Sequence, residues 1–117
     1  MANTYLSLYA HVVFSTKHRQ PIITDDIRDR LWAYMGGIAR DNNVKAIKVG
    51  GVDNHVHLLL SQPATITMAK TVQLIKGGSS KWVHDTFHLP QFTWQEGYGA
   101  FSVNVSLLDT TIRYIER

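Results

Sequence analysis

The sequence predicts an α+β domain of the ferredoxin-like type, in which two helices cover one face of an antiparallel sheet. Three observations support this prediction. Four segments alternate apolar and polar residues with the period of two that is typical of strands. Two longer segments place apolar residues at helical spacing and separate the strands in the order β-α-β-β-α-β. A further helical segment follows the last strand.

The first predicted strand covers residues 5–15. Its apolar set of alternating side chains would face the core and consists of Leu6, Leu8, Ala10, Val12 and Phe14. Tyr9 and His11 belong to the other set and would lie on the opposite face, because side chains alternate along a strand.

The first predicted helix follows a basic loop at residues 15–21. Thr24 is placed to be its N-cap, and Asn42-Asn43 ends it. Its apolar stripe would consist of Ile27, Leu31, Tyr34, Met35 and Ile38.

The next two strands are predicted at residues 44–50 and 52–60, with Gly50-Gly51 as the tight link of an antiparallel hairpin. In the second of them Val56, Leu58 and Leu60 would face the core. His55 and His57 would then lie on the open face with His11.

The second helix is predicted to begin near Thr65 or Thr67 and to run toward Phe87. Its apolar stripe would consist of Met68, Val72, Ile75, Trp82 and Val83. Gly77-Gly78 lies inside it, and each glycine costs about 1 kcal/mol relative to alanine, so a bend or a close backbone approach is expected there. A last strand at residues 99–106 and a helix from Leu107 to Arg117, capped by Ser106, complete the order.

Composition limits the class of protein. A chain of 117 residues is enough for one domain, residues 1–117, with a single core. The net charge of +3 is compatible with a nucleic-acid partner. The absence of cysteine excludes disulfides and thiolate metal sites. With no signal-peptide pattern and no membrane-spanning run, we expect a cytoplasmic protein that does not associate with membranes.

The pair His55 and His57 is the strongest candidate for a chemical site. Residues at i and i+2 of a strand point to the same face, with roughly 6.6 Å between their Cα atoms, so two imidazoles can converge on one ion. The alternative is a pair of hydrogen-bonded histidines on a half-wet sheet. A third histidine, His11, on the same face favours a site.

Several tracts together resemble the single-tyrosine HUH transposases, which move insertion sequences as single-stranded DNA. They are YAHVVFSTKHR at residues 9–19, DNHVHLLL at 53–60, IKGGSSK at 75–81, WQEGYGAFS at 94–102, and Tyr114-Ile115. The resemblance implies that His55 and His57 hold Mg²⁺ or Mn²⁺ at the scissile phosphate. It also implies that Tyr114, on the C-terminal helix, is the nucleophile and forms a 5′-phosphotyrosine link with a free 3′-OH.

The chemistry is consistent with these residue types. A phenol is protonated at neutral pH and needs assistance to act as a nucleophile. Imidazole ligands alone would suit zinc or copper better, so Mg²⁺ or Mn²⁺ rests on the resemblance. Tyr9, on the face of His11, is the main rival of Tyr114 as nucleophile, and a packing role for Tyr114 stays open.

Basic and aromatic side chains supply candidates for DNA contact, because cations neutralise phosphates and aromatic rings stack on unpaired bases. They are Lys17, His18, Arg19, Lys76, Lys81 and Arg113, with Trp94 as a possible stacking surface. His11 is expected to support the site rather than to bind the metal.

The resemblance further implies a homodimer acting on single-stranded DNA, with hairpin-containing element ends as the expected substrate. It leaves open whether Tyr114 acts in its own subunit or in the partner's. The family places a glutamine metal ligand four residues beyond the tyrosine, and this sequence ends at Arg117. We therefore expect a truncated last helix. Two alternatives remain, a domesticated relative that binds or cuts palindromic repeat hairpins and a non-catalytic nucleic-acid-binding module.

Overall fold

The computed structural model describes residues 8–116 and confirms the predicted α+β class. The four strands form one antiparallel sheet in the order β2-β3-β1-β4. The strands are β1 (Tyr9–Ser15), β2 (Lys45–Gly51), β3 (His55–Ser61) and β4 (Gly99–Val103), and the helices are α1 (Asp25–Asp41), α2 (Met68–Phe87) and α3 (Leu108–Glu116). Short 3-10 turns at Lys17–Arg19 and Val105–Leu107 precede α1 and α3. Leu6, predicted for the core, lies outside the described residues.

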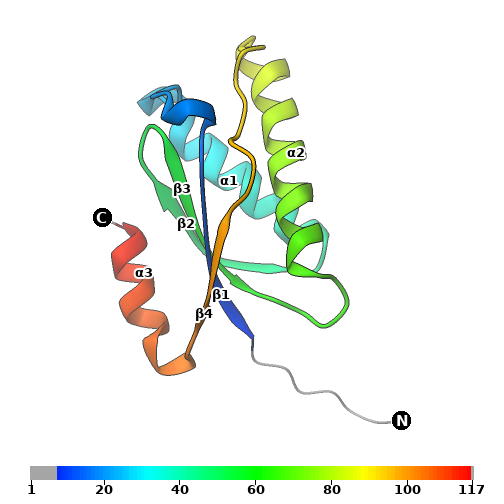
Figure 1. The fold of residues 1–117 in the computed structure, drawn as a ribbon, viewed down its shortest axis with the longest axis vertical. Coiled ribbons are helices and arrows are strands. Elements are labelled where there is room, and N and C mark those ends of the chain that lie inside the picture. Colours follow the sequence, from blue (N-terminus) through cyan, green and yellow to red (C-terminus); the bar gives the residue numbers. More distant parts are fainter. Residues whose placement is uncertain (1–7, 117) are drawn as a thin grey trace.

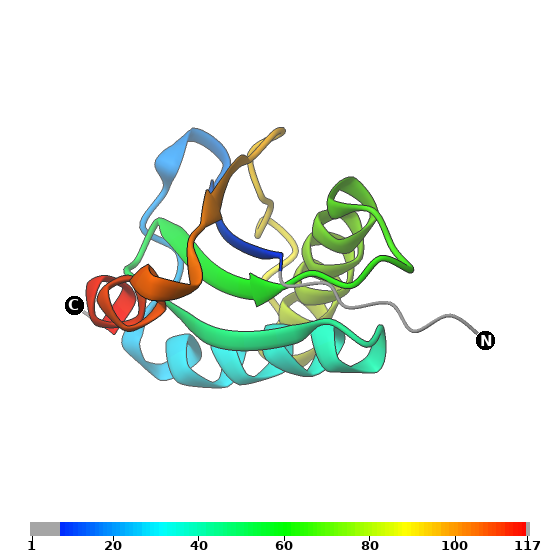
Figure 2. The same cartoon turned by 90° about the horizontal axis from the view of Figure 1, so that it is seen from below.

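One face of the sheet packs against α1 and α2, as predicted. The inward set of β1, Ala10, Val12 and Phe14, joins the inward set of β3 and the buried side chains of both helices in a single apolar cluster. Figure 2 shows α1 running beneath the strands. Because side chains alternate along a strand and this core occupies one face of the sheet, His11, His55 and His57 lie on the other face.

The second face is covered in part by α3, which lies on the opposite side of the molecule from α2 (Figures 1 and 2). Leu59 of β3 points to this face and is nevertheless fully buried, as is Ile115 of α3 at 4% exposure. Neither belongs to the main cluster. The sheet therefore has a small second apolar contact under α3.

Gly50 of β2 makes the approach of α3 possible. A Cβ at this position would lie 2.7 Å from the carbonyl oxygen of Ile115 and 2.8 Å from its Cγ2. The prediction that Gly50-Gly51 forms the hairpin link was wrong. Gly50 pairs with His57 and Gly51 with Val56, so the turn is made by residues 52–54 instead.

Three side-chain predictions need correction. Leu8, which directly precedes β1, is 53% exposed instead of entering the core. Tyr34 is 40% exposed and stacks on Trp82 at the surface, with ring centroids 4.7 Å apart, instead of entering the core. The turn before α3 is capped by Asn104, whose side-chain oxygen accepts a hydrogen bond from the Ser106 amide, so Ser106 is not the cap.

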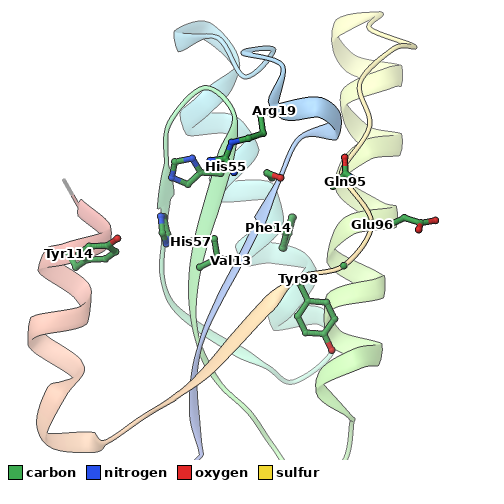
Figure 3. Close-up of a pocket in the computed structure, with 11 residues that line it drawn as sticks. Val13, Phe14, Arg19, His55, His57, Gln95, Glu96, Tyr98 and Tyr114 are labelled. Atoms are coloured by element: carbon green, nitrogen blue, oxygen red, sulfur yellow. The ribbon is translucent and has the colours of Figure 1, made fainter.

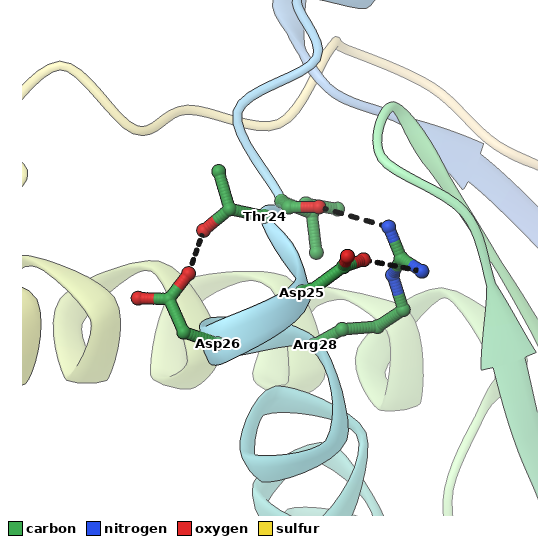
Figure 4. A network of polar contacts seen from close by, with 5 residues as sticks. Thr24, Asp25, Asp26 and Arg28 are labelled. Carbon is green, nitrogen blue, oxygen red and sulfur yellow. Dashed lines mark hydrogen bonds and ion pairs between the residues drawn. The ribbon is translucent and has the colours of Figure 1, made fainter.

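The start of α1 is held by side-chain contacts (Figure 4). Thr24 occupies the N-cap position as predicted, but its hydroxyl donates to the Asp26 carboxylate and caps no backbone amide. Arg28 pairs with Asp25 at 3.1 Å. Both acidic residues lie in the first turn, where the helix dipole favours them.

The helix α2 is continuous through its glycine pair. A Cβ at Gly78 would lie 2.8 Å from Cδ1 of Ile38, so this glycine admits a side chain of α1, while Gly77 has open space around it. The expected close approach is therefore between helices, and it involves only one of the two glycines. Within the described residues, no helix is long and apolar enough to cross a bilayer.

Candidate active site

Three histidines come together on the face that α3 partly covers. His57 on β3 lies between His55 and His11, and its ring centroid is 5.0 Å from each of theirs. His11 Nε2 and His57 Nδ1 are 2.9 Å apart and share a hydrogen bond. The sheet register explains this, because β1 pairs with β3 in a way that sets His11 diagonal to His57.

Hydrogen bonds leave the Nε2 atoms of the metal-ligand candidates available. Asn54 places its side-chain oxygen 2.8 Å from His55 Nδ1, and an amide oxygen only accepts, so Nδ1 carries the proton and Nε2 the lone pair. When His57 Nδ1 donates its proton to His11 Nε2, the lone pair of His57 is likewise on its Nε2 atom. Metal-binding histidines are commonly oriented in this way by a partner on the other ring nitrogen.

The electrostatic environment keeps the three imidazoles neutral. Burial lowers the pKa of His11 and of His55, and Arg19 lowers the pKa of His55 further. Burial, then His11 and His55, lower the pKa of His57 from its ordinary 6.5 to about 4. At neutral pH these rings therefore carry lone pairs, which is the form that binds metal ions.

Tyr114 reaches this cluster from α3. Its ring lies edge-on to that of His57, with centroids 5.5 Å apart (Figure 3). The centroid of the His11 ring is 6.0 Å from that of Tyr114. The side chain is 54% exposed, so its hydroxyl is open to a ligand. The next residue, Ile115, is the buried one that packs against Gly50, and this contact sets the direction of Tyr114.

A cavity of about 360 Å³ opens beside the histidines (Figure 3). It is lined by His55, His57 and Tyr114, and by Arg19, Gln95 and Tyr98 among others. Tyr9 lines a separate groove beside Phe101. The structure therefore separates Tyr9 from the histidine pair and brings Tyr114 to it.

The residues present supply part of a metal site. Across residues 8–116, no group of three or more His, Cys, Asp or Glu side chains is arranged to hold an ion. His55 and His57 offer two neutral nitrogen ligands on one face. A divalent ion held here would take its other ligands from water and from oxygens of a substrate. The donor set therefore leaves coordination positions that phosphate oxygens could fill.

The predicted DNA-contact residues are spread over several surfaces. Lys17 and Arg19 are exposed on the turn after β1, and Arg113 is exposed on α3. Lys81 is exposed on α2 and pairs with Asp85 at 2.7 Å. Of the four, Arg19 is the one that lines the cavity.

Two members of the predicted set have different surroundings from those expected. Trp94 was predicted as a possible stacking surface, but the residue is 8% exposed and its ring packs edge-on against Phe14 and Phe92, so little of it is accessible to a base. Its indole N–H donates to Ser79. Lys76 donates to two backbone carbonyls at 2.7 Å, so most of its donors are already engaged with the protein.

Sequence reasoning missed several residues of the site. Asn54 directly precedes the histidine pair, and an amide at that place could have indicated a partner for His55. Gln95 and Tyr98 line the cavity, and the glycines on both sides of Tyr98 were the available signal for an exposed turn. Gly50 carried no signal beyond that of an ordinary turn.

Comparisons with known proteins identify a family for this chain. The family model of IS200-like transposases matches residues 4–117. The ISDra2 transposase TnpA of Deinococcus radiodurans is 25% identical over 114 residues, covering 91% of this chain and 80% of the relative. The IS200 transposase of Salmonella typhimurium is 23% identical over 104 residues, covering 84% of this chain and 68% of the relative.

Two solved structures share the fold. A protein of Deinococcus radiodurans R1 assigned as a transposase superposes with a TM-score of 0.80 at 23% identity, over 99% of this chain and 95% of that one. A REP-associated tyrosine transposase bound to a REP hairpin gives a TM-score of 0.66 at 13% identity, over 98% of this chain and 68% of that one.

Proposed function

The chain belongs to the family of IS200-like transposases, and on that premise we propose that it cleaves and rejoins single-stranded DNA through a covalent link to Tyr114. In this proposal the protein excises and inserts an insertion sequence. The observation that carries the proposal is the meeting of Tyr114 with His57 and His11 at ring distances of 5.5 and 6.0 Å. Tyr114 also shares a cavity with His55 and His57, whose Nε2 atoms are the available ones. A phenol beside two such nitrogens is what a metal-assisted tyrosine nucleophile requires.

The proposed reaction is a transesterification at phosphorus. The Tyr114 oxygen bonds to the phosphorus and loses its proton, while the bond from phosphorus to the 3′-oxygen breaks and that oxygen leaves as a hydroxyl. The 5′-phosphate stays on the tyrosine. Because the phosphodiester energy is conserved in the new bond, the 3′-OH of another strand can reverse the step without a nucleotide cofactor.

His55 and His57 are the residues that would hold a divalent ion, Mg²⁺ or Mn²⁺. Bound there, such an ion would offset charge on the phosphoryl and leaving oxygens. The lowered pKa of His57 supports this role, because a ring that stays neutral can accept the ion without first losing a proton. His11 would hold His57 in orientation.

The proposed partners are single-stranded DNA with hairpin-containing ends and a second copy of the chain. One structural neighbour was solved with a REP hairpin, which supports a hairpin substrate. Arg19 in the cavity and Arg113 beside Tyr114 are the cations best placed to contact phosphates. A dimer suits the chemistry, since two DNA ends must be handled together.

A non-catalytic nucleic-acid-binding module of the same fold is the weaker alternative. RNA-binding modules with this strand order present aromatic residues on the open face of the central strands. On β3 that face carries His55 and His57 instead. A domesticated relative that acts on palindromic repeats differs only in its DNA, so the choice of substrate distinguishes it.

The test is formation of a covalent protein–DNA adduct. The full chain is incubated with Mn²⁺ and single-stranded DNA carrying either the ends of its element or a repeat hairpin. We expect an adduct with the wild type, none with Tyr114→Phe, and undiminished adduct with Tyr9→Phe as the matched control. His55→Ala and His57→Ala should fold and bind DNA without metal-dependent cleavage. An adduct that survives in Tyr114→Phe would refute the assignment.

A further inference from the structure

The wall of the cavity that faces the histidine pair is formed by residues 95–98, between α2 and β4. This segment belongs to no helix or strand, so other contacts must hold it. Gln95 is held from β1 and the turn after it, because its amide donates to the Ser15 carbonyl at 2.8 Å and its side-chain oxygen accepts from the His18 amide at 3.2 Å. Lys76 of α2 extends this hold along the segment, since its Nζ donates to the carbonyls of Gln95 and Gly97, each at 2.7 Å. One side chain thus fixes the backbone on both sides of Glu96.

Lys76 is one of a row of polar side chains by which α2 holds this part of the chain. Ser79 accepts from the Trp94 indole at 3.0 Å, and His84 Nε2 lies 2.6 Å from the Phe92 carbonyl oxygen. Lys76 and Ser79 are three residues apart and lie on one side of α2. His84, five residues beyond Ser79, contacts the same segment nearer its start. The end of the row nearest the cavity is Lys76.

Lys76 is half-buried, and its ammonium is engaged with the protein. Besides the two carbonyls, its ammonium lies 5.1 Å from the centre of the Phe14 ring. Burial lowers its pKa, and Glu96 opposes this effect. A lysine that spends two of its three N–H donors on backbone has little left for a phosphate.

Tyr98 is the side chain that this segment presents. It is 41% exposed and lines the cavity that also contains His55, His57 and Tyr114 (Figure 3). Gly97, just before it, has φ of 84°, a left-handed conformation that glycine adopts without strain. The turn at Gly97, which Lys76 holds through hydrogen bonds, is therefore the one that orients Tyr98.

We propose that Tyr98 stacks on an unpaired base of the DNA strand whose phosphate lies at the histidine pair, and that Lys76 is the positioning residue that holds Tyr98 there. The inference rests on the proposed function. This segment offers an aromatic ring, and the lysine that holds it is already bound to carbonyls, so this wall suits a base better than a phosphate. Arg19, which lines the same cavity, stays available for a phosphate. Stacking tolerates any base, because every base has a π-face.

The first test measures stacking without cleavage. The Tyr114→Phe protein is titrated with single-stranded element-end DNA in which 2-aminopurine replaces, one at a time, the nucleotides flanking the cleavage position. Stacking quenches this fluorophore, so we expect one position to be quenched on binding. Adding Tyr98→Ala should remove that quenching and weaken binding about 5- to 150-fold, whereas Tyr98→Phe and Tyr98→Trp should retain both.

Tyr34→Ala is the matched control, since Tyr34 is equally exposed, at 40%, but lies outside the cavity. It should leave binding and quenching unchanged. Equal affinities for Tyr98→Ala and the unsubstituted protein, or quenching that persists in Tyr98→Ala, would overturn the inference. These results do not depend on an adduct, so failure of the proposed nucleophile would be seen separately.

The second test separates positioning from phosphate binding by Lys76. A lysine that contacts a phosphate contributes about 0.7 to the slope of log K against log salt for single strands. We expect Lys76→Met to lose the quenching and weaken binding with an unchanged salt slope, and Lys76→Arg to restore part of the quenching. A slope reduced by about 0.7 with quenching intact would show that Lys76 binds DNA directly.

Discussion

Replacing Gly50 with alanine tests how α3 aims Tyr114. The added Cβ would lie 2.7 Å from the Ile115 carbonyl oxygen and 2.8 Å from Ile115 Cγ2. An ordinary contact is about 3.5 Å, so α3 must recede by about 0.8 Å or leave the sheet. Tyr114 is the adjacent residue and would move with it.

The expected effect is on the chemical step. A displacement near 1 Å of a reacting group costs up to about 100-fold in rate, so single-turnover adduct formation by Gly50→Ala should slow about 10- to 100-fold. This corresponds to about 1.4 to 2.7 kcal/mol in the barrier. Binding of single-stranded DNA and of Mn²⁺ should change little, because His55 and His57 lie on β3 and stay in place.

Gly77→Ala is the matched control. Gly77 lies inside α2 with nothing within 4 Å of an added Cβ, so alanine should keep the adduct rate and stabilise the helix by up to about 1 kcal/mol. The refuting result is a folded Gly50→Ala protein whose adduct rate stays within about twofold of wild type. In that case the contact of Ile115 with Gly50 would not be the one that positions Tyr114 for reaction.

Three further perturbations address the support of the site. His11→Ala removes the partner of His57 Nδ1, so Mn²⁺ affinity in calorimetric titration should fall about 10- to 100-fold; an unchanged affinity would exclude His11 from the site. The pKa of His57 is about 4 in the folded protein and 6.5 ordinarily, so the unfolded chain binds the proton more readily. Without metal, the free energy of unfolding should therefore fall as the pH drops from 6.5 toward 4. Urea denaturation in EDTA measures it, and a profile just as steep in His57→Gln would contradict the reasoning. Ser79→Ala leaves the Trp94 N–H buried without its acceptor and should cost about 1 to 3 kcal/mol in denaturant unfolding, against less than about 1 for Ser80→Ala; equal losses would count against this bond.

Alternation along the strands was enough to predict the sheet and the face of the histidines. A half-buried strand must keep its apolar residues on one side, so the apolar set ending at Phe14 fixed the side of His11. The same reasoning applied to Val56 and Leu58 placed His55 and His57. These assignments depend on local period alone, and they were confirmed.

Predictions that depended on distant partners fared worse. Local sequence predicts Trp94 to be an exposed aromatic residue in a loop, because it does not show that Ser79 and Phe14 contact the ring. Local sequence predicts Lys76 to be a free cation, because it does not show that the segment ending at Gly97 packs along α2. In each case the deciding contact joins residues far apart in sequence, and no local pattern carries that information.

The helix that carries Tyr114 is held less firmly than the other two helices. Ile115 is the one buried residue of α3, whereas α1 buries four. The ion pair of Lys48 with Glu116 at 3.8 Å is partly exposed and contributes at most about 1 kcal/mol. A nine-residue helix has little stability of its own. Its position therefore depends on the fit of Ile115 against Gly50. If Tyr114 is the nucleophile, as proposed, this one contact would position it on an element that can separate from the sheet at low cost.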